Sequence, residues 1–312
     1  MQGLCDIFVD FFVTDNIMSK ILPFSGTATA LVTPFSDGKI DFERLGALIE
    51  LQIQCGIRAL VIGGTTGEAA TLSDAEREAL YRFSIDASGG RATVILGTGT
   101  NDTRLAISHT RLAERLGADA VLTVTPYYNK GTPRGIVEHY RAIAAATSLP
   151  VILYNVPSRT GVNLTLEILY ELAKVENIVA IKEASDSLDR LVALSASFGD
   201  SLYLYSGNDS QYYPTLALGG KGIISVASNL VPRQMNAIYH AFSEGNAPLA
   251  KARADALLPL FHVLFLETNP SPVKYALHRL GLCENEVRLP LGCVTDPVAA
   301  EIERTMRAQG LL

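Results

Sequence analysis

Three polar side chains at the ends of apolar runs could carry chemistry in this 312-residue chain: Lys182, Tyr154 and Arg159. Lys182 interrupts the apolar run IVAIKEAS (178–185), and burial there would lower the pKa of the ammonium and make a nucleophilic amine available. The phenol of Tyr154 can relay protons, and the planar guanidinium of Arg159 suits a substrate carboxylate. These groups would serve an enzyme that forms a Schiff base with a 2-oxo acid.

Each of these residues also has a simpler explanation. A lone strand lysine is usually an edge residue or extends its head group to water. Tyr154 could be a core tyrosine with a satisfied hydroxyl, and Arg159 an exposed loop charge. The segment GGTTGE (63–68) could be a plain glycine turn, or a carboxylate-binding loop with exposed N–H groups and the hydroxyls of Thr65 and Thr66.

Eight short apolar runs alternate with helical segments and would position these residues. Because the runs are continuously apolar, we expect strands that are buried on both faces of a parallel sheet. Eight such units favour a (β/α)8 TIM barrel of the α/β class, in which reacting groups lie at the C-terminal ends of the strands. No GxGxxG follows the first run, which counts against a dinucleotide-binding sheet. The expected strands are 26–35, 59–64, 92–99, 120–126, 150–157, 178–185, 202–209 and 222–228.

The helical pattern suggests three parts of the chain. One helix should begin after Ser73, with Glu76 as its capping-box partner, and beyond the eighth unit the pattern is entirely helical. We expect an N-terminal extension at 1–21, the barrel at 22–245 and a C-terminal helical subdomain at 246–312. The opening segment lacks the basic region and cleavage site of a signal peptide.

Composition excludes several classes of function. The net charge of -6 gives no basic surface for nucleic acid. The sequence contains no run of about 18 apolar residues, which is the length needed to span a membrane. The four cysteines and five histidines are dispersed without the spacing of a metal site or a disulfide framework. We therefore expect a cytoplasmic enzyme with no metal.

Six motifs in order resemble the dihydrodipicolinate synthases (4-hydroxy-tetrahydrodipicolinate synthases): GGTTGEA, VTPYYN, YNVPSRTG, IKEAS, YSGND and ETNPSPVK. This family belongs to the pyruvate-dependent class I aldolase superfamily, which includes N-acetylneuraminate lyase. The resemblance covers residues 22–295. It implies a barrel with C-terminal helices, no cofactor, and usually a homotetramer built as a dimer of dimers. The implied reaction condenses pyruvate with L-aspartate 4-semialdehyde, on the way to diaminopimelate and lysine.

The resemblance also implies catalytic residues. Lys182 matches the lysine that forms the Schiff base with pyruvate. Tyr154 matches the general acid/base, which is linked through Thr65 to Tyr128. In the family, the tyrosine at the position of Tyr128 reaches into the active site of a neighbouring subunit.

Four positions are expected to bind substrate, and three of them match residues of the family. Thr66 matches a contact to the pyruvate carboxylate, and Arg159 matches the arginine that holds the carboxylate of the semialdehyde. Ile224 matches a position whose backbone carbonyl lies near the lysine. Gly207, in YSGND, is the fourth expected substrate-binding position, although the asparagine beside it, where SGDD is commoner, has no explanation from the sequence.

Two other readings compete with a synthase. A retro-aldolase for a sugar acid or a hydroxylated 2-oxo acid would use the same Schiff base, and GTTGE also occurs in 2-keto-3-deoxygluconate aldolases. The arginine of PSRTG favours the synthase, because sialic-acid lyases act on a polyhydroxylated chain and are not expected to carry it. A catalytically silent barrel kept for binding would need the loss of Lys182, Tyr154 or Arg159, and all three are present.

We predict weak or absent feedback inhibition by lysine. Asn101 and Tyr127 match the cleft of lysine-inhibited relatives, but the positions where those relatives carry serine, histidines and a glutamate differ. The differing positions are Ala69, Asp74, Arg77 and Leu105. A turnover assay with millimolar lysine should leave the rate nearly unchanged, and strong inhibition would contradict the prediction.

Overall fold

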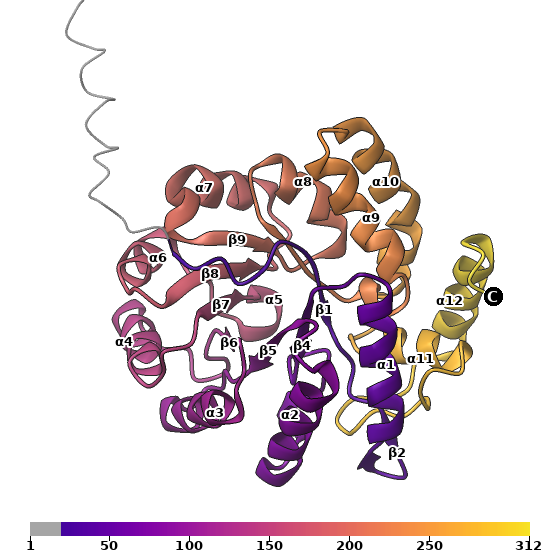
Figure 1. Cartoon of the computed structure of the whole chain (residues 1–312), viewed down its shortest axis with the longest axis horizontal. Helices are drawn as coiled ribbons and strands as arrows, with labels where there is room; N and C mark the ends of the chain where they lie inside the picture. The colour runs from indigo at the N-terminus through magenta and orange to yellow at the C-terminus, as the bar shows by residue number, and fades with distance from the viewer. Residues whose placement is uncertain (1–19) are drawn as a thin grey trace, which may run out of the picture.

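Eight parallel strands close into a barrel, and helices surround it (Figure 1). The structure is a computed structural model and describes residues 20–312, so most of the expected extension at 1–21 lies outside the described residues. Around the barrel the strand order is β1-β10-β9-β8-β7-β6-β5-β4. The barrel strands are β1 (Gly26–Ala30), β4 (Ala59–Ile62), β5 (Thr93–Gly97), β6 (Ala120–Val124), β7 (Val151–Asn155), β8 (Ile178–Glu183), β9 (Tyr203–Ser206) and β10 (Gly222–Ser225).

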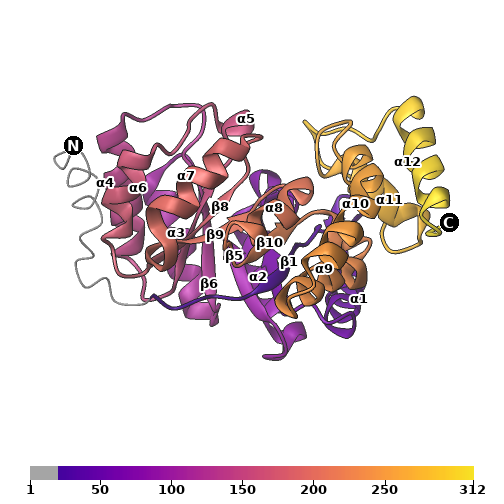
Figure 2. The same ribbon diagram turned by 90° about the horizontal axis from the view of Figure 1, so that it is seen from above.

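The α-helices alternate with the strands and continue after the last of them. The barrel helices are α1 (Phe42–Gln54), α2 (Asp74–Ser88), α3 (Thr103–Leu116), α4 (Pro133–Ala144), α5 (Pro157–Thr160), α6 (Leu166–Ala173), α7 (Leu188–Phe198), α8 (Tyr212–Ala217) and α9 (Pro232–Ser243). Three more follow, α10 (Ala247–Val263), α11 (Ser271–Arg279) and α12 (Asp296–Ala308). Both views place α11 and α12 on the side opposite α4 and α6 (Figure 2). The eight-fold barrel and the C-terminal helices are confirmed, while the assignment of 246–312 to a separate subdomain stays a prediction.

The first expected strand, 26–35, is too long. β1 ends at Ala30, and a hairpin of β2 (Phe35–Ser36) and β3 (Lys39–Ile40) follows. Its turn residues Asp37 and Gly38 both have positive φ, 52° and 75°, which is the Asp-Gly signature of a tight hairpin. The sequence prediction missed this turn, and it also missed the four-residue helix α5.

The core has two layers, because side chains in a strand alternate between its two faces. One apolar cluster fills the barrel, with members such as Ala28, Val61 and Ile152. The larger cluster lies between the strands and the surrounding helices, with members such as Leu60, Leu153 and Ile181. Burial on both faces explains why the strand sequences are continuously apolar.

The capping box at the start of α2 is confirmed. The Ser73 hydroxyl accepts from the Glu76 N–H at 3.3 Å, and the Glu76 carboxylate accepts from the Ser73 N–H at 2.9 Å. Glu76 also pairs with Arg288, whose hydrogen bonds hold the pKa of this carboxyl at about 2. The start of α2 is thereby tied to the C-terminal segment. Among the helices of residues 20–312, none is long and apolar enough to cross a membrane.

Candidate active site

The register between β7 and β8 places Tyr154 opposite Lys182. The Lys182 Nζ lies 4.3 Å from the centroid of the Tyr154 ring, and both side chains are buried, with 6% and 7% exposure. The two residues that the sequence singled out for an amine and a proton relay therefore meet inside the barrel.

Burial gives the Lys182 amine its reactivity. Desolvation lowers the pKa of its ammonium from 10.5 to about 7, opposed by the negative charge of Asp209 and assisted by the positive charge of Arg159. About half of the amine is then neutral near pH 7. Desolvation also raises the pKa of the Tyr154 phenol, which the nearby Arg159 charge and Thr65 hydroxyl oppose. The phenol therefore keeps its proton at neutral pH.

Two cavities meet at a shared wall made of Tyr154, Val156, Arg159 and Asn269. The larger, of about 890 Å³, contains Lys182. The smaller, of about 420 Å³, is lined in part by residues of α2 and α3. Of the residues predicted from the sequence, the larger cavity also includes Thr66 and Gly207, and the smaller includes Thr65. The smaller cavity further includes the positions compared with lysine-inhibited relatives, namely Ala69, Asp74, Arg77, Leu105 and Tyr127.

Asn269 holds two of the predicted substrate-binding residues. Its backbone oxygen accepts from the Arg159 Nη2 at 3.0 Å, and its side-chain amide donates to the Thr66 Oγ1 at 3.0 Å. The motif ETNPSPVK contains Asn269, but the sequence offered no role for it, because both of its partners lie far away along the chain. The guanidinium of Arg159 remains exposed at the wall between the cavities and can receive a carboxylate.

Gly207 lines the cavity that contains Lys182, whereas Ile224 does not. The Gly207 N–H donates to the Glu183 oxygen at 2.6 Å, and a Cβ at this position would lie 2.5 Å from the Cβ of Ala184. Only glycine fits that approach between β8 and β9. Ile224 is fully buried in β10, with its side chain in the cluster inside the barrel.

Tyr128 is not brought to the site within one chain. Its side chain is 88% exposed, its φ is +69°, and it contributes to neither of the two cavities. The neighbouring Tyr127 does contribute to the smaller one. The role of Tyr128 in a neighbouring subunit stays a prediction.

The sequence analysis did not predict a buried ion pair at the end of the loop 63–68. The Lys274 Nζ lies 2.7 Å from the Glu68 Oε1, and both side chains are fully buried. Glu68 also accepts from the Arg288 N–H at 2.9 Å, and its φ is +55°. Burial lowers the pKa of Lys274, and the Glu68 carboxylate opposes this. The available signal was a lysine within the helical apolar pattern of SPVKYALHR, between Val273 and Ala276.

Asp209 is a second buried charged residue near the site that was not predicted from the sequence. This buried carboxylate accepts from the Ser225 hydroxyl and from the N–H groups of Val226 and Ala227, at 2.5, 3.3 and 3.0 Å. Burial raises its pKa, while these hydrogen bonds and the charge of Lys182 lower it. Its position at the C-terminal end of a barrel strand, in YSGND, was the signal that could have identified it.

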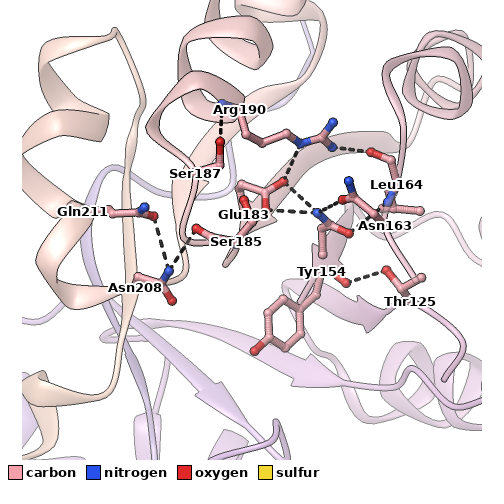
Figure 3. A network of polar contacts seen from close by, with 11 residues as sticks. Thr125, Tyr154, Asn163, Leu164, Glu183, Ser185, Ser187, Arg190, Asn208 and Gln211 are labelled. Atoms are coloured by element: carbon pink, nitrogen blue, oxygen red, sulfur yellow. Dashed lines mark hydrogen bonds and ion pairs between the residues drawn. The ribbon is translucent and has the colours of Figure 1, made fainter. Parts of the chain in front are cut away.

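The structure also explains the asparagine of YSGND. The Asn208 Nδ2 donates to the Ser185 oxygen at 3.1 Å and to the Asp186 Oδ1 at 3.3 Å, and Gln211 supplies a third acceptor at 3.3 Å. Figure 3 shows the hydrogen bonds of Asn208 to Ser185 and Gln211. An aspartate here would place a carboxylate among three acceptor oxygens, so the acidic side chain of Asp186 favours the amide.

Within residues 20–312, no group of three or more histidine, cysteine, aspartate or glutamate side chains is arranged to hold a metal ion. The larger cavity contains the Lys182 amine, the Tyr154 phenol, the Thr66 hydroxyl and the Arg159 guanidinium, beside the acidic side chains of Asp186, Asp209 and Glu267. Together they can form an imine, move a proton and bind a carboxylate.

Comparison with known proteins gives one consistent family. A profile of the dihydrodipicolinate synthetase family matches residues 23–309. The 4-hydroxy-tetrahydrodipicolinate synthase of Alkaliphilus oremlandii is 45% identical over 289 residues, which cover 93% of this chain and 100% of that protein.

Solved structures agree with this result. The dihydrodipicolinate synthase of Thermotoga maritima has a TM-score of 0.91 at 39% identity, with 93% of this chain and 100% of that chain covered. The enzyme of Acinetobacter baumannii, solved in complex with pyruvate, has a TM-score of 0.91 at 40% identity and the same coverage.

Replacement of Lys274 by methionine should destabilise the protein strongly. Lys274→Met leaves the Glu68 carboxylate buried without its cation, which costs about 3–5 kcal/mol of unfolding free energy. Denaturant unfolding measures this loss. The control is Lys251→Met, which breaks an exposed pair with Asp255 on α10 and should leave the free energy of unfolding nearly unchanged. Equal losses in the two variants would contradict the prediction.

Proposed function

The chain belongs to the dihydrodipicolinate synthetase family, and we propose that Lys182 is the amine with which it carries out the family's reaction. The activity of the protein is that of a 4-hydroxy-tetrahydrodipicolinate synthase, an enzyme of lysine and diaminopimelate biosynthesis. The substrates are pyruvate and L-aspartate 4-semialdehyde. The observation that carries the assignment of Lys182 is a buried amine with a pKa of about 7, placed over the ring of Tyr154 in a cavity.

The first half of the reaction makes a nucleophile from pyruvate. The neutral Lys182 amine adds to the ketone carbon, and loss of water from the carbinolamine leaves an iminium. Loss of a methyl proton then gives an enamine, because the iminium accepts the electron pair. Tyr154 is suited to these proton transfers, since its phenol is protonated at neutral pH and lies beside Lys182.

The second half joins the two substrates. The enamine carbon attacks the aldehyde carbon of the semialdehyde, the aldehyde oxygen takes up a proton, and the iminium re-forms. Attack by the substrate's own amino group on the iminium carbon closes the ring and releases Lys182. Arg159 holds the semialdehyde carboxylate in this proposal, which is supported by its position on the wall of the cavity that contains Lys182. Thr66 contacts the pyruvate carboxylate in the same proposal, which is supported by its position in the lining of this cavity.

We also infer that the enzyme works in the cytoplasm as a homotetramer in which Tyr128 completes a neighbour's site. The support is the 88% exposed aromatic side chain of Tyr128 on a backbone with positive φ. An exposed tyrosine in that conformation is unusual in a monomer surface. Tyr127 beside it contributes to the cavity that contains Thr65, so a partner at this face would lie close to the proposed proton relay.

Borohydride trapping with pyruvate tests the role of Lys182. We expect an adduct on Lys182 in the wild type and none in Lys182→Ala, as read by mass spectrometry of the peptide. The initial trapping rate should rise with pH through about 7 and level off above it, because only the neutral amine attacks. An adduct on another lysine, or a flat pH dependence between pH 5 and about 9, would refute the assignment.

The replacement of Arg159 tests the anchor for the second substrate. A charge-assisted contact contributes about 1.5–3 kcal/mol, so Arg159→Ala should raise the KM for aspartate semialdehyde by about 10- to 100-fold. The KM for pyruvate should change much less. Steady-state kinetics with each substrate varied in turn measures both constants, and Arg104→Ala, at an exposed arginine on α3, is the surface control. Equal increases in both KM values would contradict this role.

A further inference from the structure

Behind Lys182 and Tyr154 lies a polar cluster that the proposed chemistry does not use. The parallel register pairs Asn155 with Glu183 directly after the pair of Tyr154 with Lys182. Because successive side chains point to opposite faces of a strand, the second pair lies outside the barrel wall. Figure 3 shows Glu183 and Arg190 gathered there, with the ring of Tyr154 directed away from them.

Hydrogen bonds join the two strands at this point. The Asn155 Nδ2 donates to both carboxylate oxygens of Glu183, at 3.0 and 2.9 Å. The Arg190 Nε donates to the Glu183 Oε2 at 3.2 Å. We call Asn155, Glu183 and Arg190 the bracket. Asn155 and Glu183 are fully buried, and the Arg190 charge neutralises the carboxylate.

The bracket also holds the loop that carries Arg159. The Leu164 N–H donates to the Asn155 Oδ1 at 3.0 Å, and Arg190 donates to the Leu164 oxygen. Asn163 accepts from the Asn155 amide at 2.8 Å. The loop from 156 to 164 therefore leaves β7 beside the bracket and returns to it, with Arg159 between the two attachment points.

On the other strand, the bracket reaches the loop after β8. The Ser185 N–H donates to the Glu183 Oε1 at 2.9 Å, and the Glu183 backbone oxygen accepts from the Gly207 N–H. Glu183 thus contacts the elements on both sides of Lys182. A carboxylate with this many donors is far more constrained than a surface glutamate. Without Asn155 and Arg190, the burial of the Glu183 charge would be unfavourable.

We propose that the bracket positions Lys182, Tyr154 and Arg159 relative to one another for the reaction. This inference rests on the function proposed above. None of the three bracket residues touches the cavity that contains the amine, so they are positioning residues that act through their strand neighbours. Their effect on rate follows from alignment, since a displacement of about 1 Å of a reacting group can lower a rate about a hundredfold.

The test compares the bracket with a matched hydrogen-bond cluster at the other end of β8. Asn177, just before β8, donates from its side chain to the oxygens of Ala144, Thr147 and Leu149, at 3.0, 2.9 and 3.4 Å. Asn177→Ala removes these bonds far from the amine and controls for lost stability. Glu183→Gln keeps the shape of the bracket but turns an amide donor toward Asn155 or Arg190, which are donors themselves.

The experiment measures kcat and the rate of borohydride trapping of pyruvate in full-length protein. The temperature is one at which circular dichroism shows that each variant is folded. We expect Glu183→Gln to lose about a hundredfold in kcat and in trapping rate, with a smaller change in the KM for pyruvate. Asn177→Ala should lower the melting temperature and keep kcat within about twofold. If Glu183→Gln keeps wild-type kcat, or if both variants lose kcat equally, the inference is overturned.

A second variant covers the case in which Glu183→Gln does not fold. Arg190→Lys keeps a positive charge beside Glu183 but cannot bond the carboxylate and the Leu164 oxygen with one planar fork. We expect a folded protein with kcat lowered about tenfold, and wild-type kcat in this variant would overturn the inference. A wild type that traps no pyruvate would refute the proposed function itself, whereas normal trapping in wild type and both variants would refute only the positioning role.

Discussion

Parallel pairing between β7 and β8 determines which side chains can meet inside the barrel. In the observed register, Tyr154 faces Lys182 inside, and Asn155 faces Glu183 outside. A slip of one residue would turn each side chain to the other face, placing the carboxylate inside and the amine among the helices. The reactive pair, its cavity and its hydrogen-bonded support all follow from this single alignment, and the closure of the barrel on both sides maintains it.

Two buried lysines in this chain have opposite surroundings. Lys274 has a carboxylate at 2.7 Å and forms a neutral pair with Glu68. Lys182, within the part of the chain that the structure describes, forms no ion pair; it faces an aromatic ring, and the opposing charge of Asp209 only partly offsets its desolvation. Pairing keeps a lysine charged and structural, whereas the lack of a close carboxylate leaves the amine free to lose its proton.

Local patterns in the sequence were sufficient for the barrel and for the expectation that Lys182, Tyr154 and Arg159 lie together at the strand ends, while their catalytic roles stay a prediction. Continuous apolar runs indicate strands covered on both sides, and the fold then places their C-terminal ends together. The strand ends were overestimated, as at 26–35, because apolar residues continue into loops that the barrel buries. Asn269 and Lys274 were missed because their partners Arg159 and Glu68 lie 110 and 206 residues away. Such contacts depend on how the finished fold brings distant segments together, which periodicity does not encode.

Asn269 supports Arg159 and Thr66 from a segment that follows every barrel strand. The ribosome makes the chain from its N-terminus, and domains form as their residues emerge. All eight strands, with Lys182 and Tyr154, are therefore synthesised before the residue that holds the Arg159 guanidinium exists. During translation the barrel with Lys182 and Tyr154 can form first, and Arg159 and Thr66 gain their contacts with Asn269 only when the C-terminal part of the polypeptide has left the ribosome.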